Sequence, residues 1–215
     1  MPSLASDPYS LTDDQLHRMN VSREFLMRRN EEKARLDAQA PRVGDPAPPF
    51  LLARLVTHRA QTAGGVSLAE LLGRPVALIF GSYTCPVYRR QIGRFNSAWR
   101  QYSRGVHFLG IYIREAHPLD GWRVPQNDSL ECAIYQPTTA EERARIASHC
   151  AEQSDVQYPL AIDSMGDQTM IAFAGTPERL YALDSQGIVR FKSAIGPFDD
   201  VEIDLWEQTL AALST

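Results

Sequence analysis

Two continuous apolar runs are the most regular features of the hydrophobic pattern. Residues 76–80 and 106–113 carry mostly apolar side chains, which is typical of strands buried on both faces of a sheet. Between these runs, Ile92, Phe95 and Trp99 recur at spacings of three or four, which predicts a helix. The pattern therefore predicts a strand, a helix and a second strand that pair in parallel.

Weaker patterns complete the main domain. Ser67 and Thr139 are each followed three residues later by a glutamate, which predicts two helix N-caps. The further elements that we expect are strands over 51–56 and 158–163, helices over 66–73, 139–153 and 201–213, and a hairpin over 180–192. This order predicts an α/β, thioredoxin-like fold, in which helices flank a central mixed sheet.

The first forty residues have a different pattern. Residues 11–40 are rich in charged side chains and have only an approximate apolar stripe, which predicts one or two helices. Such helices could pack on the body of the protein or form a dimerisation arm, so a homodimer stays open. Proline-rich residues 41–50 then end any helix. We therefore expect an N-terminal helical extension over 1–42 and the main domain over 43–215.

Composition and charge narrow the functional classes. The 215 residues include 22 basic and 26 acidic side chains, which leaves no excess of positive charge for a nucleic-acid backbone. A mean hydropathy of −0.29 and the absence of a span-length apolar run predict no membrane segment. The polar N-terminus resembles no secretory leader, so we expect a cytoplasmic protein.

Cys85 is the strongest candidate for chemistry. The three cysteines are too few for a disulfide scaffold, and no histidines or cysteines have metal-ligand spacing. Cys85 lies between a predicted strand and a predicted helix, with Pro86 at the favoured first helical position. A helix N-terminus stabilises a thiolate, so we expect a lowered pKa for Cys85. A small buried core residue is the alternative role.

Two segments resemble the thioredoxin superfamily. The run Cys85-Pro86-Val87-Tyr88 resembles its Cys-x-x-Cys motif, with Tyr88 in place of the second cysteine. The run 175–178, Gly-Thr-Pro-Glu, resembles its loop with a cis-proline beside the reactive sulfur. We therefore predict a cis peptide bond before Pro177.

Longer segments resemble the iodothyronine deiodinases. Residues 81–86 are similar to that family's active-site segment, in which selenocysteine stands at the position of Cys85. Residues 111–122 are similar to its Ile-Tyr-Ile-Glu-Glu-Ala-His-Pro-x-Asp-Gly-Trp segment, and residues 178–181 and 196–197 also match. The resemblance implies a thiol-dependent oxidoreductase that removes iodide from an iodinated phenol ring. It also implies no bound cofactor and an external reductant such as thioredoxin or glutathione.

The resemblance also assigns roles to individual residues. Cys85 would be the nucleophile, Glu115 and His117 a proton relay or hydrogen-bond partners of the substrate, and Ser82 and Thr84 partners of the thiolate. Arg179 would bind the carboxylate of an amino-acid substrate, although a strand arginine can equally pair with Glu178 or a helix carboxylate. The remaining candidates are five substrate-binding residues and two resolving thiols: Tyr112, Trp122, Asn127, Pro177 and Glu178, and Cys132 and Cys150.

Two departures keep other functions open. Tyr83 replaces a family cysteine, and Asn127 replaces a family histidine and cannot shuttle a proton. The first alternative is a peroxiredoxin-like thiol peroxidase, which Thr84 beside Cys85 and the segment over 43–50 favour. The second is a thioredoxin-like binding module without catalysis, because the second active-site cysteine is missing.

Overall fold

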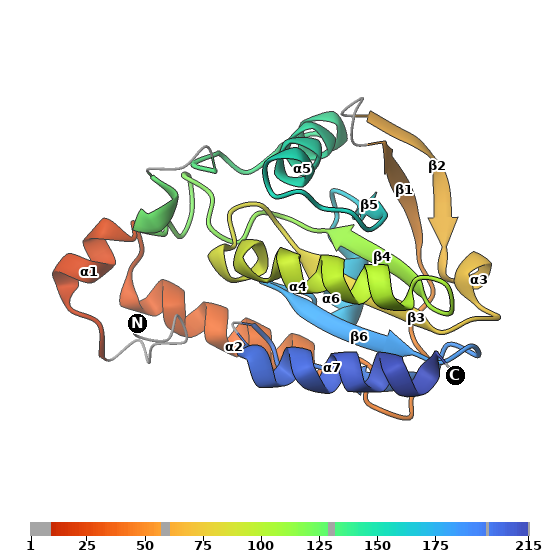
Figure 1. Ribbon diagram of the computed structural model, residues 1–215. Coiled ribbons are helices and arrows are strands. Elements are labelled where there is room, and N and C mark those ends of the chain that lie inside the picture. The colour runs from red at the N-terminus through yellow and green to blue at the C-terminus, as the bar shows by residue number, and fades with distance from the viewer. Residues whose placement is uncertain (1–9, 57–60, 129–131, 197, 215) are drawn as a thin grey trace.

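A seven-stranded mixed sheet forms the centre of the molecule, in the order β2-β1-β5-β4-β3-β6-β7. The computed structural model describes residues 10–56, 61–128, 132–196 and 198–214, so Pro197 and the first nine residues of the expected extension lie outside the described residues (Figure 1). The strands are β1 (Leu51–Val56), β2 (Gln61–Ser67), β3 (Val76–Gly81), β4 (His107–Tyr112), β5 (Leu160–Ile162), β6 (Arg179–Leu183) and β7 (Val189–Lys192).

The central strands are buried on both faces, as the apolar runs predict. β3 pairs in parallel with β4 and antiparallel with β6, and β6 forms the expected hairpin with β7. Alternate residues of β3 enter two different cores: Ala77 and Ile79 pack in one, and Leu78 and Phe80 in the other. β3 therefore lies between two hydrophobic cores, one on each face of the sheet.

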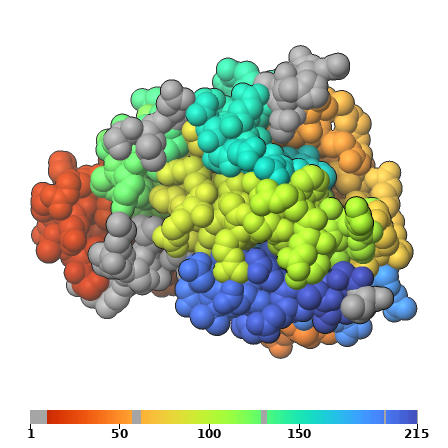
Figure 2. All heavy atoms as spheres, viewed as in Figure 1, coloured from red at the N-terminus to blue at the C-terminus, as the bar shows by residue number. Residues whose placement is uncertain are grey.

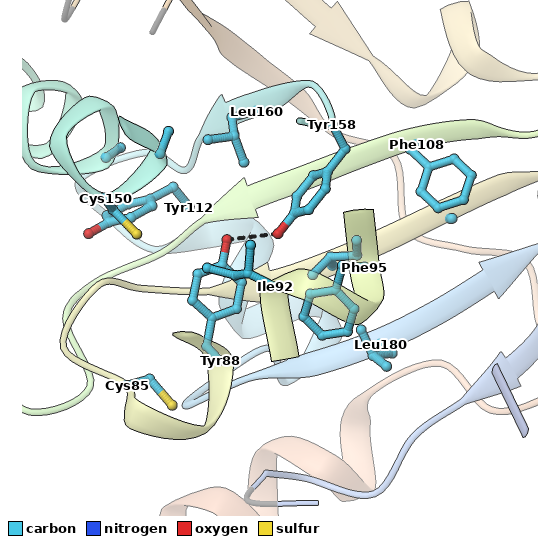
Figure 3. Close-up of a cluster of buried hydrophobic side chains, with 14 of the residues drawn as sticks. Cys85, Tyr88, Ile92, Phe95, Phe108, Tyr112, Cys150, Tyr158, Leu160 and Leu180 are labelled. Atoms are coloured by element: carbon cyan, nitrogen blue, oxygen red, sulfur yellow. Dashed lines mark hydrogen bonds between the residues drawn. The ribbon is translucent and has the colours of Figure 1, made fainter. Parts of the chain in front are cut away.

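Helices cover both faces of this sheet. One core, part of which is drawn in Figure 3, includes Phe95 of α4 and Trp206 of α7, and the other includes Phe173 of α6. The bounds of the helices in the main body are α3 (Leu68–Leu71), α4 (Pro86–Tyr102), the 3-10 helix η3 (Pro125–Asn127), α5 (Ala140–Gln153), α6 (Gln168–Phe173) and α7 (Asp200–Leu213).

Local sequence signals explain several element ends. Ser67 and Glu70 form a capping box at α3, and Thr139 accepts from the backbone N–H of Glu142 at α5, so both predicted N-caps are confirmed. β2 and α6 have no counterpart among the expected elements. The β2 sequence Gln-Thr-Ala-Gly-Gly-Val-Ser has no apolar alternation, and this strand is paired along β1.

The N-terminal region forms α1 (Asp13–Arg18) and α2 (Arg23–Gln39). α2 packs on the body of its own chain, where Leu36 contacts Ala40 and Ala174 in a small apolar cluster. α1 projects at one end of the molecule (Figure 2). α2 therefore follows the first of the two expected arrangements, in which the N-terminal helices pack on the body of the protein. Among the described residues, none of the helices has both the length and the apolar character that crossing a bilayer requires.

Candidate active site

Cys85 is the N-cap of α4, directly after the turn that follows β3 (Figure 3). Its backbone N–H donates to the carbonyl of Ser82 at 3.1 Å, and Pro86 occupies the first turn of the helix. Gly81 allows α4 to pack closely against the end of β3, because a Cβ there would lie 2.2 Å from the ring of Tyr88. The strand, the tight turn and the helix thus place the cysteine as the sequence predicts.

The expected thiolate is not stabilised in this state. Cys85 is only 2% exposed. Burial, followed by the nearby Glu178 carboxylate, raises the pKa of the Cys85 thiol well above its ordinary value, although the amides of Tyr88 and Val87 act in the opposite direction. The expectation of a lowered pKa is therefore wrong here, because desolvation outweighs the helix N-terminus.

Glu178 is the acidic group that contacts the sulfur. The Cys85 thiol donates to Glu178 Oε2 at 3.9 Å, while Glu178 Oε1 is buried without a hydrogen-bond partner among the described residues. Burial raises the pKa of Glu178 to about 8. The preceding Thr176–Pro177 peptide bond is cis, as predicted. Cys85 and Glu178 therefore form a buried pair of acids, and both carry their protons at neutral pH.

Glu115 connects the loops that follow β3 and β4. Its Oε2 accepts from the backbone N–H of Thr84 at 2.8 Å and from the Thr84 hydroxyl at 2.7 Å, and its other oxygen accepts from the Tyr112 hydroxyl. Burial raises the pKa of Glu115, while the bonds from Tyr112 and Thr84 partly offset that effect. In this state Glu115 positions the Cys85 loop through Thr84.

Ser82 and Thr84 contact backbone groups rather than the sulfur. Ser82 Oγ accepts from the backbone N–H of Ala116 at 3.1 Å, and Thr84 Oγ1 accepts from that of His117 at 2.9 Å. The two side chains thus join the Cys85 loop to the segment with Glu115 and His117. Their expected contact with the thiolate stays a prediction.

His117 lies in an aromatic and cationic environment. Its Nδ1 is 3.1 Å from the carbonyl of Trp122, and the two rings meet edge to face with centroids 4.7 Å apart. Burial, followed by the charge of Arg29, lowers the pKa of His117 to about 3. His117 is therefore neutral at physiological pH, and one of its ring nitrogens can donate while the other accepts.

Asn127 lies behind the Cys85 loop. Its amide Nδ2 donates to the carbonyl of Thr84 at 2.8 Å, and its Oδ1 accepts from Arg89 Nη2 at 2.8 Å and from the Cys132 thiol at 3.4 Å. Arg89 also donates to the carbonyl of Tyr83. The guanidinium of Arg89 therefore joins Asn127 to the Cys85 loop.

All three cysteines are free and buried. Cys150 belongs to α5, where Figure 3 shows it beside Tyr112. Burial raises the pKa of both Cys132 and Cys150 above the ordinary thiol value. A resolving role for either thiol stays a prediction.

Arg179 is paired with a carboxylate of the protein itself. Its Nη2 donates to Asp37 Oδ1 at 2.8 Å, and its guanidinium lies 5.9 Å from the ring centroid of Tyr181. Arg179 is only 2% exposed. Of the two roles that the sequence allows for Arg179, this state shows the ion pair with a helix carboxylate. Asp37 thus takes the place at Arg179 where a substrate carboxylate would bind.

Two cations of α2 belong to the site and were not among the sequence candidates. The Arg29 guanidinium lies 5.1 Å from the ring centroid of Trp122. Burial, followed by the charge of Arg29, lowers the pKa of Lys33 to about 8, while the nearby acidic groups Cys85 and Glu178 act in the opposite direction. The sequence contains one signal for them: Arg29, Lys33 and Asp37 are each four residues apart, which places all three on one helix face.

Solved structures place the chain among thioredoxin-fold proteins. The thioredoxin domain of a Bacteroides vulgatus thiol-disulfide oxidoreductase matches with a TM-score of 0.55 and 14% identity, over 81% of this chain and 99% of that one. A DsbE-like protein from Chlorobium tepidum matches with a TM-score of 0.56 and 21% identity, over 81% and 99%. The fold is therefore α/β and thioredoxin-like, with one cysteine at the N-terminus of α4.

Sequence comparison then identifies the family. The model of the iodothyronine deiodinase family matches residues 4–207, so this chain belongs to that family. Pig thyroxine 5-deiodinase is 34% identical over 131 residues, which are 58% of this chain and 39% of the pig protein. The Xenopus laevis type I iodothyronine deiodinase is 33% identical over 125 residues, which are 58% and 47%. The matches thus span less than half the length of these relatives.

Proposed function

We propose that this protein removes iodide reductively from an iodinated phenol, with Cys85 as the nucleophile. The observation that carries the proposal is the contact of 3.9 Å between the Cys85 thiol and Glu178 Oε2. This contact places a sulfur nucleophile next to a group that can carry a proton, in a member of the deiodinase family. An iodinated tyrosine or thyronine is the substrate class that this family membership favours.

The Cys85–Glu178 pair can supply both reacting groups. When the pair has lost one proton to solvent, the remaining proton can reside on Glu178 and leave Cys85 as the thiolate. The thiolate attacks iodine, a sulfur–iodine bond forms, and the electrons of the carbon–iodine bond remain on the ring carbon. Glu178 then donates its proton to that carbon. The products are the deiodinated phenol, a sulfenyl iodide on Cys85 and the Glu178 carboxylate.

External thiols would return the enzyme to its starting state. One thiol attacks the sulfur of the sulfenyl iodide, which releases iodide and a proton and leaves a mixed disulfide on Cys85. A second thiol attacks that mixed disulfide, and the Cys85 thiol and an external disulfide are formed. Overall, one aryl iodide is reduced while two thiols are oxidised. We propose thioredoxin or glutathione as the donor, because the Cys132 thiol donates to Asn127 and not to Cys85.

Iodide release from 3,5-diiodotyrosine and iodothyronines with dithiothreitol tests this proposal. We expect release by the protein and loss of release in Cys85→Ala. The Cys150→Ala variant is the matched control, because it removes another buried free cysteine. It should retain activity in this assay, since dithiothreitol supplies the reducing thiols. Release that is equal in Cys85→Ala and the unchanged protein would contradict the assignment of the nucleophile.

The same samples test the thiol peroxidase alternative. Hydrogen peroxide is supplied in place of the iodinated substrate, and oxidation of dithiothreitol is followed. Peroxide turnover that depends on Cys85, without iodide release, would replace deiodination with peroxidase activity. Absence of both activities in the unchanged protein would favour the binding module.

The organisation of the chain is a further part of the proposal. We assign residues 43–215 to the thioredoxin-like domain and 1–42 to a helical extension. Expression of residues 43–215 with measurement of cooperative unfolding tests this division. The cytoplasmic location and the homodimer stay predictions, which fractionation of host cells and analytical ultracentrifugation test.

A further inference from the structure

α2 is attached to the body by a pair of ionic contacts at one end of its polar stripe. Asp37 Oδ1 accepts from Arg179 Nη2 and from Lys192 Nζ, both at 2.8 Å. Leu36 packs beside it against Ala174. Because side chains four residues apart share a helix face, Arg29 and Lys33 point from α2 to the same side as Asp37.

The hydrogen-bonding capacity of Arg29 is largely unused. Its guanidinium lies over the indole of Trp122, 5.1 Å from the ring centroid, yet Nε and Nη2 are buried without a hydrogen-bond partner in the described part of the chain. The indole Nε1 of Trp122 is also buried and unpartnered there. Buried polar groups are normally satisfied, so unpartnered donors on two side chains in contact indicate a ligand that accepts from them.

The charges around these donors favour an anion. Burial, followed by the charge of Arg114, lowers the pKa of Arg29 to about 10. The fields of Arg29 and Lys33 act on Cys85 of α4 and on His117 of the loop after β4. The other titratable groups facing this region are Glu178, Arg89 and Glu32. An anion beside Arg29 and Lys33 would therefore offset the mutual repulsion of two partly buried cations.

We propose that Arg29, Lys33 and the indole N–H of Trp122 bind the phenolate oxygen of the iodinated ring. This inference rests on the proposed deiodination. In an iodotyrosine the iodine is ortho to the phenol oxygen. Arg29 contacts Trp122, Trp122 contacts His117, and the backbone N–H of His117 donates to Thr84, the residue before Cys85. An iodine that contacts Cys85 Sγ therefore brings this oxygen toward the Arg29 side of the site. A guanidinium and an ammonium are strong donors to an anionic oxygen.

Binding as the phenolate would also assist the proposed chemistry. The phenol loses its proton to solvent, and the negative charge is shared between the oxygen and the ortho ring carbons. The ortho carbon that carries iodine is the atom that Glu178 would protonate. Arg29 and Lys33 would be binding residues for the oxygen, and α2 would thereby become part of the substrate site.

The Cys85→Ala protein tests this inference without turnover. Binding of 3,5-diiodotyrosine is followed by the near-ultraviolet absorption of the phenolate as pH is varied. We expect the pKa of the bound phenol to fall by about one unit, which equals about tenfold tighter binding of the phenolate than of the phenol. Arg29→Gln and Lys33→Gln, each added to Cys85→Ala, should weaken binding about tenfold and reduce this shift.

Arg28→Gln is the matched control, because Arg28 is an exposed cation of the same helix. We expect it to leave both the affinity and the phenol pKa unchanged. Circular dichroism and thermal unfolding of each variant show whether α2 remains folded. Equal phenol pKa values for free and bound ligand, or equal losses in Arg28→Gln and Arg29→Gln, would overturn the inference.

Two further ligands separate the phenolate from the carboxylate. Decarboxylated 3,5-diiodotyramine should still depend on Arg29 and Lys33, whereas O-methylated diiodotyrosine should bind weakly and show no dependence on them. The reverse pattern would mean that these cations bind the carboxylate and would overturn the assignment. Absence of iodide release by the unchanged protein, together with the expected pKa shift, would reject the deiodination and retain the anion site.

Discussion

At the residue scale, the central feature is a thiol and a carboxyl that share a buried environment. Burial raises the pKa of both Cys85 and Glu178, and the thiol donates to the carboxyl group. Two groups coupled in this way titrate as a pair. The form of the pair that can react contains one proton fewer than the form present at neutral pH.

Iodide release should therefore increase with pH. The first proton leaves the pair with a midpoint near the pKa of Glu178, about 8, and the concentration of the reactive form rises through that range. A profile of iodide release between pH 6 and pH 10 measures the midpoint. Glu178→Gln should lower the rate by about 10²- to 10⁴-fold, as expected for the loss of a general acid, and remove this midpoint. A profile that is flat from pH 6 to pH 10 would contradict the proposed pair.

The conformation of Glu178 depends on Gly196. A Cβ at residue 196 would lie 2.3 Å from Cγ of Glu178, so Gly196→Ala must displace the carboxyl group from the Cys85 sulfur. We expect at least about tenfold slower iodide release with a folded protein. Gly93→Ala is the control, because a Cβ at that position in α4 meets nothing within 4 Å. It should keep full activity and stabilise the helix by about 0.5–1 kcal/mol. Equal activity of the two variants would contradict this account of Glu178.

Sequence reasoning succeeded best where local signals and motifs agree. Cys85, Glu115 and His117 follow strands that are visible as apolar runs, so their proximity could be predicted. The pKa of Cys85 could not, because the sequence shows the helix N-terminus and gives no measure of how completely the sulfur is buried. Arg29 was also missed, since its partner Trp122 lies far along the chain.

At the element scale, α2 contributes charged side chains next to the site. Its apolar stripe is weak because the face toward the body carries Arg29, Lys33 and Asp37, and Asp37 pairs there with Arg179 and Lys192. Sequence periodicity detects helices that bury apolar side chains, so it could predict the helix and could not assign its partner. β2 shows the same limit, because pairing with β1 rather than alternation defines that strand.

Asp37→Asn should loosen α2. Burial alone would raise the pKa of Asp37, but Lys192 and Arg179 outweigh it and lower that pKa. The variant leaves the buried Arg179 guanidinium without its anionic partner, so we expect a loss of about 1–2 kcal/mol of folding free energy, reduced by the partial exposure of Asp37. Urea unfolding measures this loss, and hydrogen exchange shows whether it is located in α2.

The pH dependence of that contact has a definite sign. Because the pKa of Asp37 is lower in the folded protein, its contribution is present above the unfolded value and is lost as pH falls through the folded one. The difference in stability between the unchanged protein and Asp37→Asn should therefore shrink on acidification below about pH 4. A difference that stays constant, or a variant without loss at neutral pH, would show that the contact does not hold α2.

At the scale of the whole molecule, the site assembles from segments that are far apart in the sequence. Cys85 follows β3, Glu115 and His117 follow β4, and Glu178 precedes β6, so three adjacent strands deliver their side chains to one edge of the sheet. α2 adds Arg29 and Lys33 from the region before the main domain. The thioredoxin-like topology thus explains the position of the site. The N-terminal helix α2 adds positive charge to it.

The most direct test of the central claim is deiodination in deuterium oxide. The account predicts that each iodide released from 3,5-diiodotyrosine leaves one deuterium on the ring carbon that carried the iodine, because Glu178 exchanges its proton with solvent before donating it. Mass spectrometry of the product, with iodide measured in the same sample, gives the ratio. A ratio near one that is lost in Cys85→Ala supports reductive deiodination at Cys85. Iodide release without deuterium at that carbon, or an unchanged ratio and rate in Cys85→Ala, would contradict it.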